Sequence, residues 1–213
     1  MKYTHVLWDF NGTLYDDVDV AVYCENVVLA RRGLPLLQNA DAYRAIFGFP
    51  VRDYYVRAGL TFARETFEAV GQEWYALYTA HMQNASVRDG VPAAIRAFAD
   101  AGIVQTVLSA SQIDTLRVQL GFLSLADTFD EILALGGIHA DSKEHLALDW
   151  RGRHPDASAV LIGDTVHDAD VARAALLDCI LVEGGHQCAD ALIPCGFPVV
   201  RDIPAAAEMI LKG

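Results

Sequence analysis

Acidic, basic and hydroxyl side chains stand near the ends of several apolar runs in the sequence. Asp9, Ser109 and Asp164 each follow such a run, and Lys143 stands at the start of an expected helix. Asp168 comes four residues after Asp164, about one helical turn, so the two carboxylates can face one ligand. A carboxylate nucleophile, a hydroxyl, a cation and further carboxylates are the groups that a phosphoryl-transfer site needs.

The expected chemistry follows from the properties of these groups. A carboxylate such as Asp9 can attack phosphorus and form an acyl phosphate, which divides one difficult reaction into two easier ones. Because carboxylate and phosphate repel each other, a cation has to hold them together, and Mg²⁺ prefers oxygen ligands. Ser109 taken alone is more often a helix cap. The complete set, each member near an expected strand end, indicates a site rather than separate caps and turns.

An alternation of strands and helices must position these residues. Residues 3–9 predict a first strand that ends at Asp9 and is followed by turn formers. Further strands are expected over residues 103–108, 129–135, 159–162 and 179–182. Helices are expected over residues 93–101, 112–120, 142–152 and 168–177, with a last helix from Pro204. This alternation indicates an α/β fold with a parallel sheet covered on both faces, which binds ligands at the carboxyl ends of its strands.

Residues 16–86 have a different pattern. Apolar side chains recur there at helical spacing, and glycines such as Gly33 and Gly48 divide the segment into several helices. Aromatic residues are dense in this segment, and we interpret them as the core of a small helical bundle. We therefore expect two domains, an α/β core formed by residues 1–15 and 87–213 and an all-helical cap formed by residues 16–86.

The composition limits the expected partners and location. The chain has 213 residues, of which 53% are hydrophobic, and 16 basic against 28 acidic side chains give a formal net charge of −12. Nucleic-acid binding needs a cationic surface and an anionic membrane would repel this chain, so we expect neither partner. No apolar run is long enough to span a bilayer, and an acid interrupts the start before any signal-peptide region. We expect a cytoplasmic protein, with no prediction of its oligomeric state.

The cysteines give no sign of a disulfide scaffold. Cys24, Cys179, Cys188 and Cys195 form no CxxC pair, and we interpret them as thiols in a reducing compartment. His186 and Cys188 could bind a metal ion together, but a loop pair of this kind is a weak indication. We favour the interpretation in which neither residue is a ligand.

Four short motifs, in this order, resemble those of the haloacid dehalogenase superfamily of hydrolases. The first is matched by Asp9-Phe10-Asn11-Gly12-Thr13-Leu14 and the second by Thr106-Val107-Leu108-Ser109. Lys143 matches the third, and Gly163-Asp164-Thr165-Val166-His167-Asp168 matches the fourth. The resemblance covers essentially the whole chain and points to the phosphoglycolate phosphatase-like branch, which inserts a helical cap after the first motif. It implies a Rossmann-like core and a Mg²⁺-dependent phosphatase acting on a small phosphorylated metabolite.

The resemblance also implies how the acidic residues would act. Asp9 would be the nucleophile and would carry the aspartyl phosphate. Asp9, the backbone carbonyl of Asn11 and Asp164 would bind Mg²⁺, which prefers such oxygen ligands. Asp168 would face the same ion or its water ligands.

The substrate-binding set follows in the same way. Ser109 and Lys143 would hold the phosphoryl oxygens that do not react, and Lys143 would offset the developing charge. Thr13 and Ala110 complete the part of this set that lies in the core. Arg52 is our preferred cap residue for contacting an anionic substrate. The other cap arginines that we considered are Arg44, Arg57 and Arg64.

Asn11 departs from the pattern of the family. Its phosphatases usually have Asp at this position, where it protonates the leaving oxygen and later activates water. One explanation is that another group serves, such as Asp16, Asp17 or His167. A second is a substrate with a good leaving group, such as an acyl phosphate. A third is binding of a phosphorylated ligand with weak or no turnover, and a fourth is an Asn introduced to trap the protein.

Cleavage of another bond type by the same fold is a further alternative. The family's carbon–halogen hydrolases lack the acids of the fourth motif, which this chain keeps. Its carbon–phosphorus hydrolases rely on a cap lysine, and residues 16–86 contain none. Phosphate ester hydrolysis therefore remains the main hypothesis.

Overall fold

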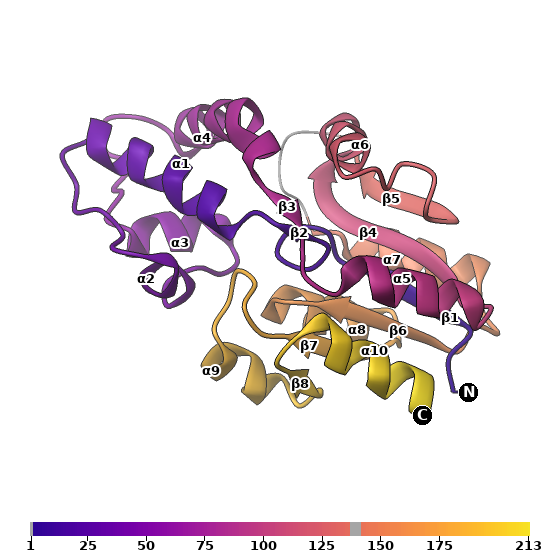
Figure 1. Cartoon of the computed structure of the whole chain (residues 1–213). Helices are drawn as coiled ribbons and strands as arrows, with labels where there is room; N and C mark the ends of the chain where they lie inside the picture. Colours follow the sequence, from indigo (N-terminus) through magenta and orange to yellow (C-terminus); the bar gives the residue numbers. More distant parts are fainter. Residues whose placement is uncertain (1, 137–141) are drawn as a thin grey trace.

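The computed structural model describes residues 2–136 and 142–213, so residues 1 and 137–141 of the expected core lie outside the described part. Its centre is a six-stranded parallel sheet in the order β5-β4-β1-β6-β7-β8 (Figure 1). The strands are β1 (His5–Trp8), β4 (Val104–Gln112), β5 (Glu131–Leu135), β6 (Ala159–Gly163), β7 (Asp178–Val182) and β8 (Val199–Val200). This confirms the parallel α/β fold that the alternation of strands and helices predicts and the Rossmann-like core that the resemblance implies.

Helices cover both faces of the sheet, because successive strand residues point to opposite sides. On β1, Val6 and Trp8 belong to one buried cluster and Leu7 belongs to the other. The first cluster includes side chains of α5 (Val91–Asp100), α6 (Ile113–Phe122) and α10 (Ile203–Lys212). The second includes side chains of α7 (Glu144–Arg153), α8 (Val166–Ala174) and α9 (Ala189–Leu192). A short 3₁₀ helix, η2 (Ile193–Cys195), follows α9.

Every strand and helix expected for the core begins within two residues of its predicted start. The expected end of β4 at residue 108 is wrong, because the strand continues to Gln112 across a register irregularity opposite β5. α8 begins at Val166, two residues early, because the Thr165 side chain caps it, and it ends at Ala174 rather than at residue 177. The two-residue strand β8 was not expected, because Val199–Val200 is too short to give a periodic signal.

A helical layer, formed by α1 to α4, occupies residues 18–81 of the chain. Its members are α1 (Val18–Arg31), α2 (Ala40–Arg44), α3 (Val51–Arg57) and α4 (Phe67–His81), and the 3₁₀ helix η1 (Met82–Asn84) follows. These helices share a buried cluster rich in aromatic residues, including Tyr43, Tyr54 and Tyr55. The chain leaves and re-enters the core through β2 (Tyr15–Asp16) and β3 (Ser86–Val87), which pair antiparallel. The domain boundaries at residues 16 and 86 stay a prediction.

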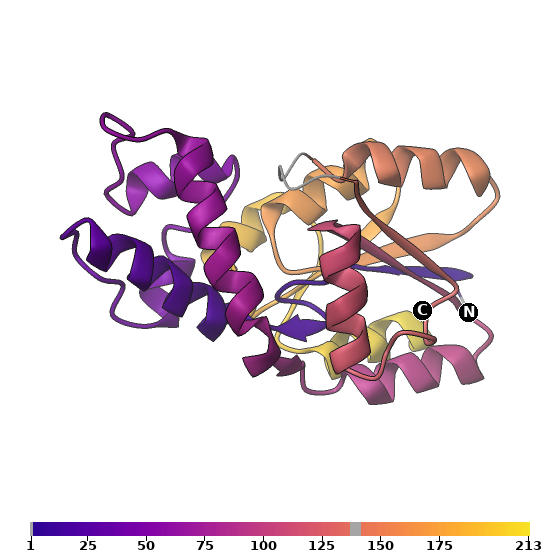
Figure 2. The same ribbon diagram turned by 90° about the horizontal axis from the view of Figure 1, so that it is seen from above.

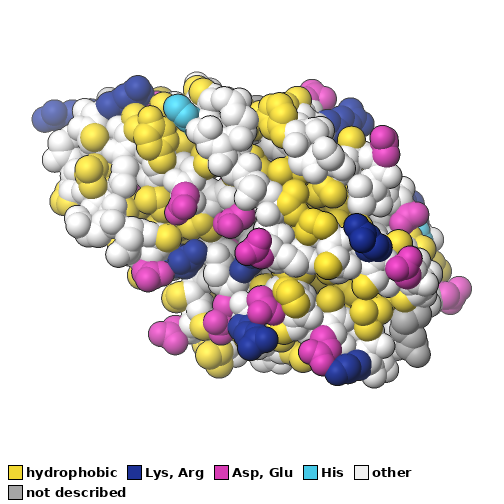
Figure 3. All heavy atoms as spheres, in the orientation of Figure 1, with side chains coloured by type: hydrophobic (Ala, Val, Ile, Leu, Met, Phe, Trp, Pro, Cys, Tyr) yellow, Lys and Arg dark blue, Asp and Glu magenta, His cyan; other side chains and the backbone are white. Residues whose placement is uncertain are grey.

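The helical layer lies beyond the end of the sheet toward which the strands run, and the two chain termini lie together at the opposite end (Figure 2). No helix in the part of the chain that the structure describes is long and apolar enough to cross a membrane. Acidic side chains are spread over one face of the molecule with basic ones among them, so that face carries no single patch of one sign (Figure 3).

Candidate active site

Three carboxylates meet where the central strands end. Asp9 follows β1 and Asp164 follows β6, and these strands are neighbours in the sheet. Asp168 lies in the first turn of α8. One oxygen atom of each carboxylate lies within 4.8 Å of the others, and all three residues are buried. The parallel sheet therefore brings together three of the residues that the motifs single out, although they are far apart in the sequence.

Lys143, the residue before α7, binds two of these carboxylates. Its Nζ forms a short ion pair with Asp9 Oδ1 and a second with Asp168 Oδ1 at 2.6 Å. The same atom donates a hydrogen bond to the backbone oxygen of Leu108 at 3.2 Å. Lys143 is only 1% exposed. Burial lowers the pKa of its ammonium, but the two carboxylates raise it further, so the net pKa is raised and Lys143 stays charged.

The carboxylates outnumber the cation that balances them. Three carboxylates and one ammonium leave two uncompensated negative charges in a buried space. Burial raises the pKa of Asp9 well above its usual range. The negative charges of Asp168 and Asp164 also raise this pKa, and together they outweigh the lowering by Lys143. A buried excess of negative charge is costly unless a cation offsets it. The donor set is all oxygen and its excess charge equals that of a divalent ion, so these residues fit Mg²⁺.

Besides Lys143, the loop that precedes α8 holds Asp168. Its Oδ2 accepts hydrogen bonds from Thr165 Oγ1 at 2.6 Å, from the Thr165 amide at 3.0 Å and from the Asp164 amide at 3.2 Å. The Asp168 amide donates in turn to Thr165 Oγ1, so Thr165 and Asp168 form a capping box. A Cβ atom on Gly163 would lie 2.3 Å from the Asp168 carboxyl carbon, so this approach needs glycine. Asp168 thus fixes the loop that carries Asp164, while its role toward a metal stays a prediction.

Asp164 is oriented by two donors from distant parts of the chain. Thr13 Oγ1 donates to its Oδ1 at 3.0 Å, and the backbone amide of His186 donates to its Oδ2 at 2.5 Å. Gly12 packs directly against this carboxylate, since a Cβ atom there would lie 2.3 Å from Asp164 Oδ2. Gly12 also has a φ of +77°, which favours glycine. Thr13, predicted as part of the substrate-binding set, therefore orients an acidic side chain in this structure.

Ser109, the last residue of the second motif, lies in the part of β4 where the register with β5 is irregular. Ser109 is buried, and its Oγ accepts a hydrogen bond from the Ser111 amide at 3.0 Å. Ala110 is half-buried between them. Ser111 also donates its hydroxyl to Asn11 Oδ1 at 2.7 Å, a contact that the sequence did not predict. Whether Ser109 and Ala110 bind substrate stays a prediction, but β4 brings this segment beside the first-motif loop.

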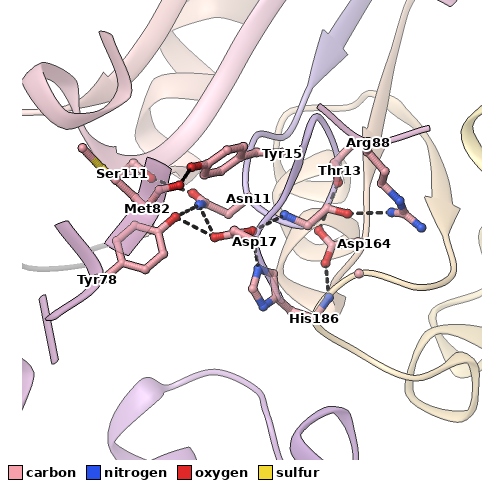
Figure 4. A network of polar contacts seen from close by, with 12 residues as sticks. Asn11, Thr13, Tyr15, Asp17, Tyr78, Met82, Arg88, Ser111, Asp164 and His186 are labelled. Carbon is pink, nitrogen blue, oxygen red and sulfur yellow. Dashed lines mark hydrogen bonds and ion pairs between the residues drawn. The ribbon is translucent and has the colours of Figure 1, made fainter. Parts of the chain in front are cut away.

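Asn11 is joined to a buried acid that the sequence left ambiguous (Figure 4). Its Nδ2 donates to Asp17 Oδ2 and to the Tyr78 hydroxyl, both at 2.7 Å. Asp17 is 2% exposed and also accepts a hydrogen bond from the Gly12 amide at 3.0 Å. Asp16, its neighbour, is exposed. Of these two acids, only Asp17 points into the site.

His186 completes this network from the loop after β7. Its Nε2 lies 3.2 Å from Asp17 Oδ1, and its Nδ1 lies 2.9 Å from the Tyr43 hydroxyl of the helical layer. Burial lowers the pKa of His186, but Asp17 and Asp164 outweigh burial and raise the pKa to about 9. Burial raises the pKa of Asp17, but His186, Tyr78 and Asn11 outweigh it and lower the pKa. The pair is therefore a buried ion pair at neutral pH.

Sequence reasoning missed several of these residues. It treated His186 as a loop residue and Tyr78 as one of the aromatic core residues of the helical bundle, and it did not name Arg88. Arg88 follows β3, and its Nη1 donates to the Gly12 oxygen at 2.6 Å while its Nη2 donates to the Glu183 oxygen. Of these residues, only His186 could have been predicted to lie near the site, because it follows a strand at the carboxyl edge of the sheet.

Arg52, our preferred cap residue for contacting the substrate, lies against aromatic rings of the helical layer. The Arg52 guanidinium lies over the rings of Phe62 and Phe67, at 5.0 and 5.9 Å from their centroids. Arg44 instead reaches the core, where its Nε donates to the Gly185 oxygen at 2.8 Å. His167, one of the residues considered as a substitute acid, packs against Phe49 with ring centroids 4.7 Å apart.

Comparisons with known proteins agree with this arrangement. The family described as haloacid dehalogenase-like hydrolase matches residues 6–182 of the chain. No curated protein sequence matches it closely.

Several solved structures share the fold over nearly the whole length of both chains. A predicted phosphatase from Clostridium acetobutylicum is 20% identical with a TM-score of 0.82 and full coverage of both chains. Protein Tyrosine Kinase A from Mycobacterium tuberculosis is 21% identical with a TM-score of 0.81 and 98% coverage of both. A predicted phosphoglycolate phosphatase from Haemophilus somnus is 15% identical with a TM-score of 0.78 and 99% coverage of both. These likenesses show the fold, and the family match over most of the chain shows more: the chain belongs to the haloacid dehalogenase-like hydrolases.

Proposed function

We propose that this protein is a Mg²⁺-dependent phosphatase that hydrolyses a small phosphorylated metabolite through an aspartyl phosphate on Asp9. The observation that carries the proposal is the buried cluster of Asp9, Asp164 and Asp168, with Lys143 bonded to two of them and two negative charges left over. Membership of a hydrolase family and the phosphatases among the fold neighbours support the reaction class. We further propose that the protein acts in the cytoplasm.

In the proposed reaction, one carboxylate oxygen of Asp9 attacks phosphorus while the bond between phosphorus and the leaving oxygen breaks. Water then attacks the phosphorus of the aspartyl phosphate, which releases inorganic phosphate and restores the Asp9 carboxylate. Lys143 and Ser109 hold the phosphoryl oxygens that do not react. Asp9, the Asn11 carbonyl and Asp164, with Asp168 nearby, would hold Mg²⁺, which supplies the positive charge that lets two anions meet.

The proton for the leaving group restricts the proposed substrate. The Asn11 amide cannot supply it, Asp16 is exposed, and His167 packs against Phe49. Asp17 already accepts hydrogen bonds from Asn11, Gly12 and Tyr78. Because acid catalysis typically contributes about 10²–10⁴-fold, its absence matters least for a leaving group of low pKa. We therefore propose a substrate of this kind, such as an acyl phosphate.

We also propose that the helical layer acts as a cap that closes over the site and excludes water. Tyr43 and Arg44 support this role, because they contact His186 and Gly185 of the core loop after β7. Arg52 is left out of the proposed substrate contacts, since its guanidinium lies over cap aromatic rings.

The test is hydrolysis of an aryl phosphate with Mg²⁺ and with a chelator, comparing the wild type with Asp9→Asn. We expect hydrolysis to require Mg²⁺ and to fall at least about 10³-fold in the variant, because the nucleophile is removed. Asp19→Asn, which removes an exposed acid of α1, is the matched control and should retain the wild-type rate. Metal-independent hydrolysis that survives Asp9→Asn would contradict the proposal. Tight Mg²⁺-dependent phosphate binding without turnover would instead favour a ligand-binding protein.

A further inference from the structure

The amide of Asn11 uses its donors and its acceptor in a single arrangement. Nδ2 donates to Asp17 Oδ2 and to the Tyr78 hydroxyl at 2.7 Å each, and Oδ1 accepts from Ser111 Oγ at 2.7 Å. Reversing the amide would place its oxygen against the Asp17 carboxylate, with no hydrogen between the two oxygens. The surroundings therefore select one orientation of this side chain.

Counting the hydrogen atoms shows why an amide fits at this position. Tyr78 has one hydroxyl hydrogen, which it donates to Asp17 Oδ2 at 2.6 Å. The Tyr78 oxygen then accepts from Asn11 Nδ2 and from Gln119 Nε2, the latter at 3.0 Å. Asn11 Nδ2, the Tyr78 oxygen and Asp17 Oδ2 lie within 2.7 Å of one another, so an N–H group of Asn11 is shared between the two oxygens. A carboxylate at position 11 has no hydrogen to donate to either partner.

Asp17 is the common acceptor of the network. Its Oδ2 accepts from Asn11 and Tyr78, while its Oδ1 accepts from the Gly12 amide at 3.0 Å and faces His186 Nε2 at 3.2 Å. Asn11 and Gly12 are the second and third residues after Asp9, the proposed nucleophile. One buried carboxylate thus holds both the side chain and the backbone of the loop that follows the nucleophile.

We propose that Asn11 and Asp17 form one positioning unit that requires an amide at one position and a carboxylate at the other, with Asp17 as the positioning residue for the loop after Asp9. In this unit position 17 carries the carboxylate and position 11 carries the amide that donates to it, so an amide fits the surroundings of position 11. The catalytic part of this inference rests on the proposed function, whereas the requirement for one amide and one carboxylate does not.

Two carboxylates at these positions would lie in hydrogen-bond contact inside the protein with no hydrogen between them, which is costly. Two amides would leave Tyr78 and the Gly12 amide with a weaker, neutral acceptor. The reciprocal arrangement restores the pattern, because a carboxylate at position 11 would accept from Ser111, Tyr78 and the amide at position 17. The oxygen of that amide would face Gly12 and His186, so the direct ion pair with His186 would be replaced by a carboxylate at the neighbouring position 11. The unit therefore predicts that two harmful substitutions compensate each other.

The experiment is a double-mutant cycle with Asn11→Asp, Asp17→Asn and the reciprocal variant that carries both. Thermal unfolding midpoints are measured without metal, and kcat and KM for an aryl phosphate are measured with Mg²⁺ well below every midpoint. We expect each single variant to lose at least about 5 °C and the reciprocal variant to recover more than half of the summed loss. We also expect kcat of the reciprocal variant to exceed that of either single variant by at least about tenfold, with KM changed less than about threefold.

Asp19→Asn serves as the control for removing an acid from the same region, and it should shift the midpoint by less than about 1 °C. Tyr78→Phe is a second, milder variant, which should lower the midpoint and kcat because Asp17 loses one donor. The proposal is overturned if Asn11→Asp is as stable as the wild type, if the two losses simply add, or if the reciprocal variant fails to fold. If no variant, wild type included, hydrolyses phosphate esters, the proposed function fails while the stability cycle still decides this inference.

Discussion

Lys143 stabilises two carboxylates of the acidic cluster by ion pairing and does not pair with the third. Its ammonium is buried and paired with both Asp9 and Asp168, so removing Lys143 would leave two buried carboxylates without their ion-pair partner. The same ammonium leaves Asp164 without an ion-pair partner among the lysines and arginines of the described chain. Burial raises the pKa of both Asp164 and Asp9, so a bound cation would stabilise the charged form of each.

A second buried acid, Glu25 of α1, lies outside the proposed reaction and controls stability instead. It is fully buried, and neither carboxylate oxygen has a hydrogen-bond partner among the described residues. Burial raises its pKa from 4.5 to about 7, and Tyr54 and Arg32 offset this only in part. Between pH 4.5 and 7 the unfolded chain releases this proton while the folded protein keeps it. The contribution of Glu25 to the free energy of unfolding therefore falls as the pH rises through that window.

We expect Glu25→Gln to remove this pH dependence. At pH 8 the variant should have a free energy of unfolding up to about 3 kcal/mol higher than the wild type, and near pH 4 the two should converge. Urea unfolding at both pH values checks this, with Asp19→Asn as the control. A wild-type slope that persists in the variant would assign the dependence to another group, such as His186.

At the residue scale, the sequence predicted the site residues that belong to a recognisable motif or that follow from the order of the motifs. Asp9, Asp164 and Asp168 belong to short motifs, and Lys143 was placed by order. Asp17 and His186 could not be predicted with equal force, because their roles arise from a contact between residues 169 positions apart. Such a contact depends on how α1 and the loop after β7 pack, which no local spacing encodes.

At the scale of elements, the loop after β7 connects the helical layer to the core. Arg44 of α2 donates to the oxygens of Gly185 and Gly184, and Gln187 Nε2 donates to the Phe47 oxygen at 3.1 Å. The same loop presents the His186 amide to Asp164. A movement of the helical layer would therefore displace the loop after β7, and with it the His186 amide that orients Asp164 in the acidic cluster.

We expect Arg44→Ala to loosen this connection. Losing two hydrogen bonds from a guanidinium should increase amide hydrogen exchange in α2 and in residues 184–187, with a loss of about 1–2 kcal/mol in the free energy of unfolding. Hydrogen-exchange mass spectrometry measures the local effect. Arg52→Ala is the matched control, because the Arg52 guanidinium lies over Phe62 and Phe67, two rings of the helical layer itself. Equal exchange in residues 184–187 for both variants would contradict the role of Arg44.

The elements of the core were predictable because apolar strands and helices alternate clearly along the chain. The polar end of β4, with Ser109, Ser111 and Gln112, was not, because its residue types indicate a turn. Pairing with β5 carries the strand through this segment in spite of its composition. That extension matters, since it delivers the Ser111 hydroxyl to Asn11.

At the scale of the whole molecule, a net charge of −12 first suggests that anions would be repelled. The site depends instead on a few buried charges. Asp17 is balanced by His186, and the acidic cluster is balanced in part by Lys143. The remaining two negative charges are what a divalent cation would neutralise before a phosphate could approach.

The most direct test of the central claim is acid-quenched mass spectrometry of the protein during turnover of an acyl or aryl phosphate with Mg²⁺. Because Asn11 cannot activate water as a carboxylate would, we expect the aspartyl phosphate to accumulate, and the peptide that contains Asp9 should gain the mass of one phosphoryl group. Asp9→Asn should remove this adduct, and Asp19→Asn should keep it. Steady hydrolysis with no adduct, or an adduct that persists in Asp9→Asn, would contradict the assignment of Asp9 as the nucleophile.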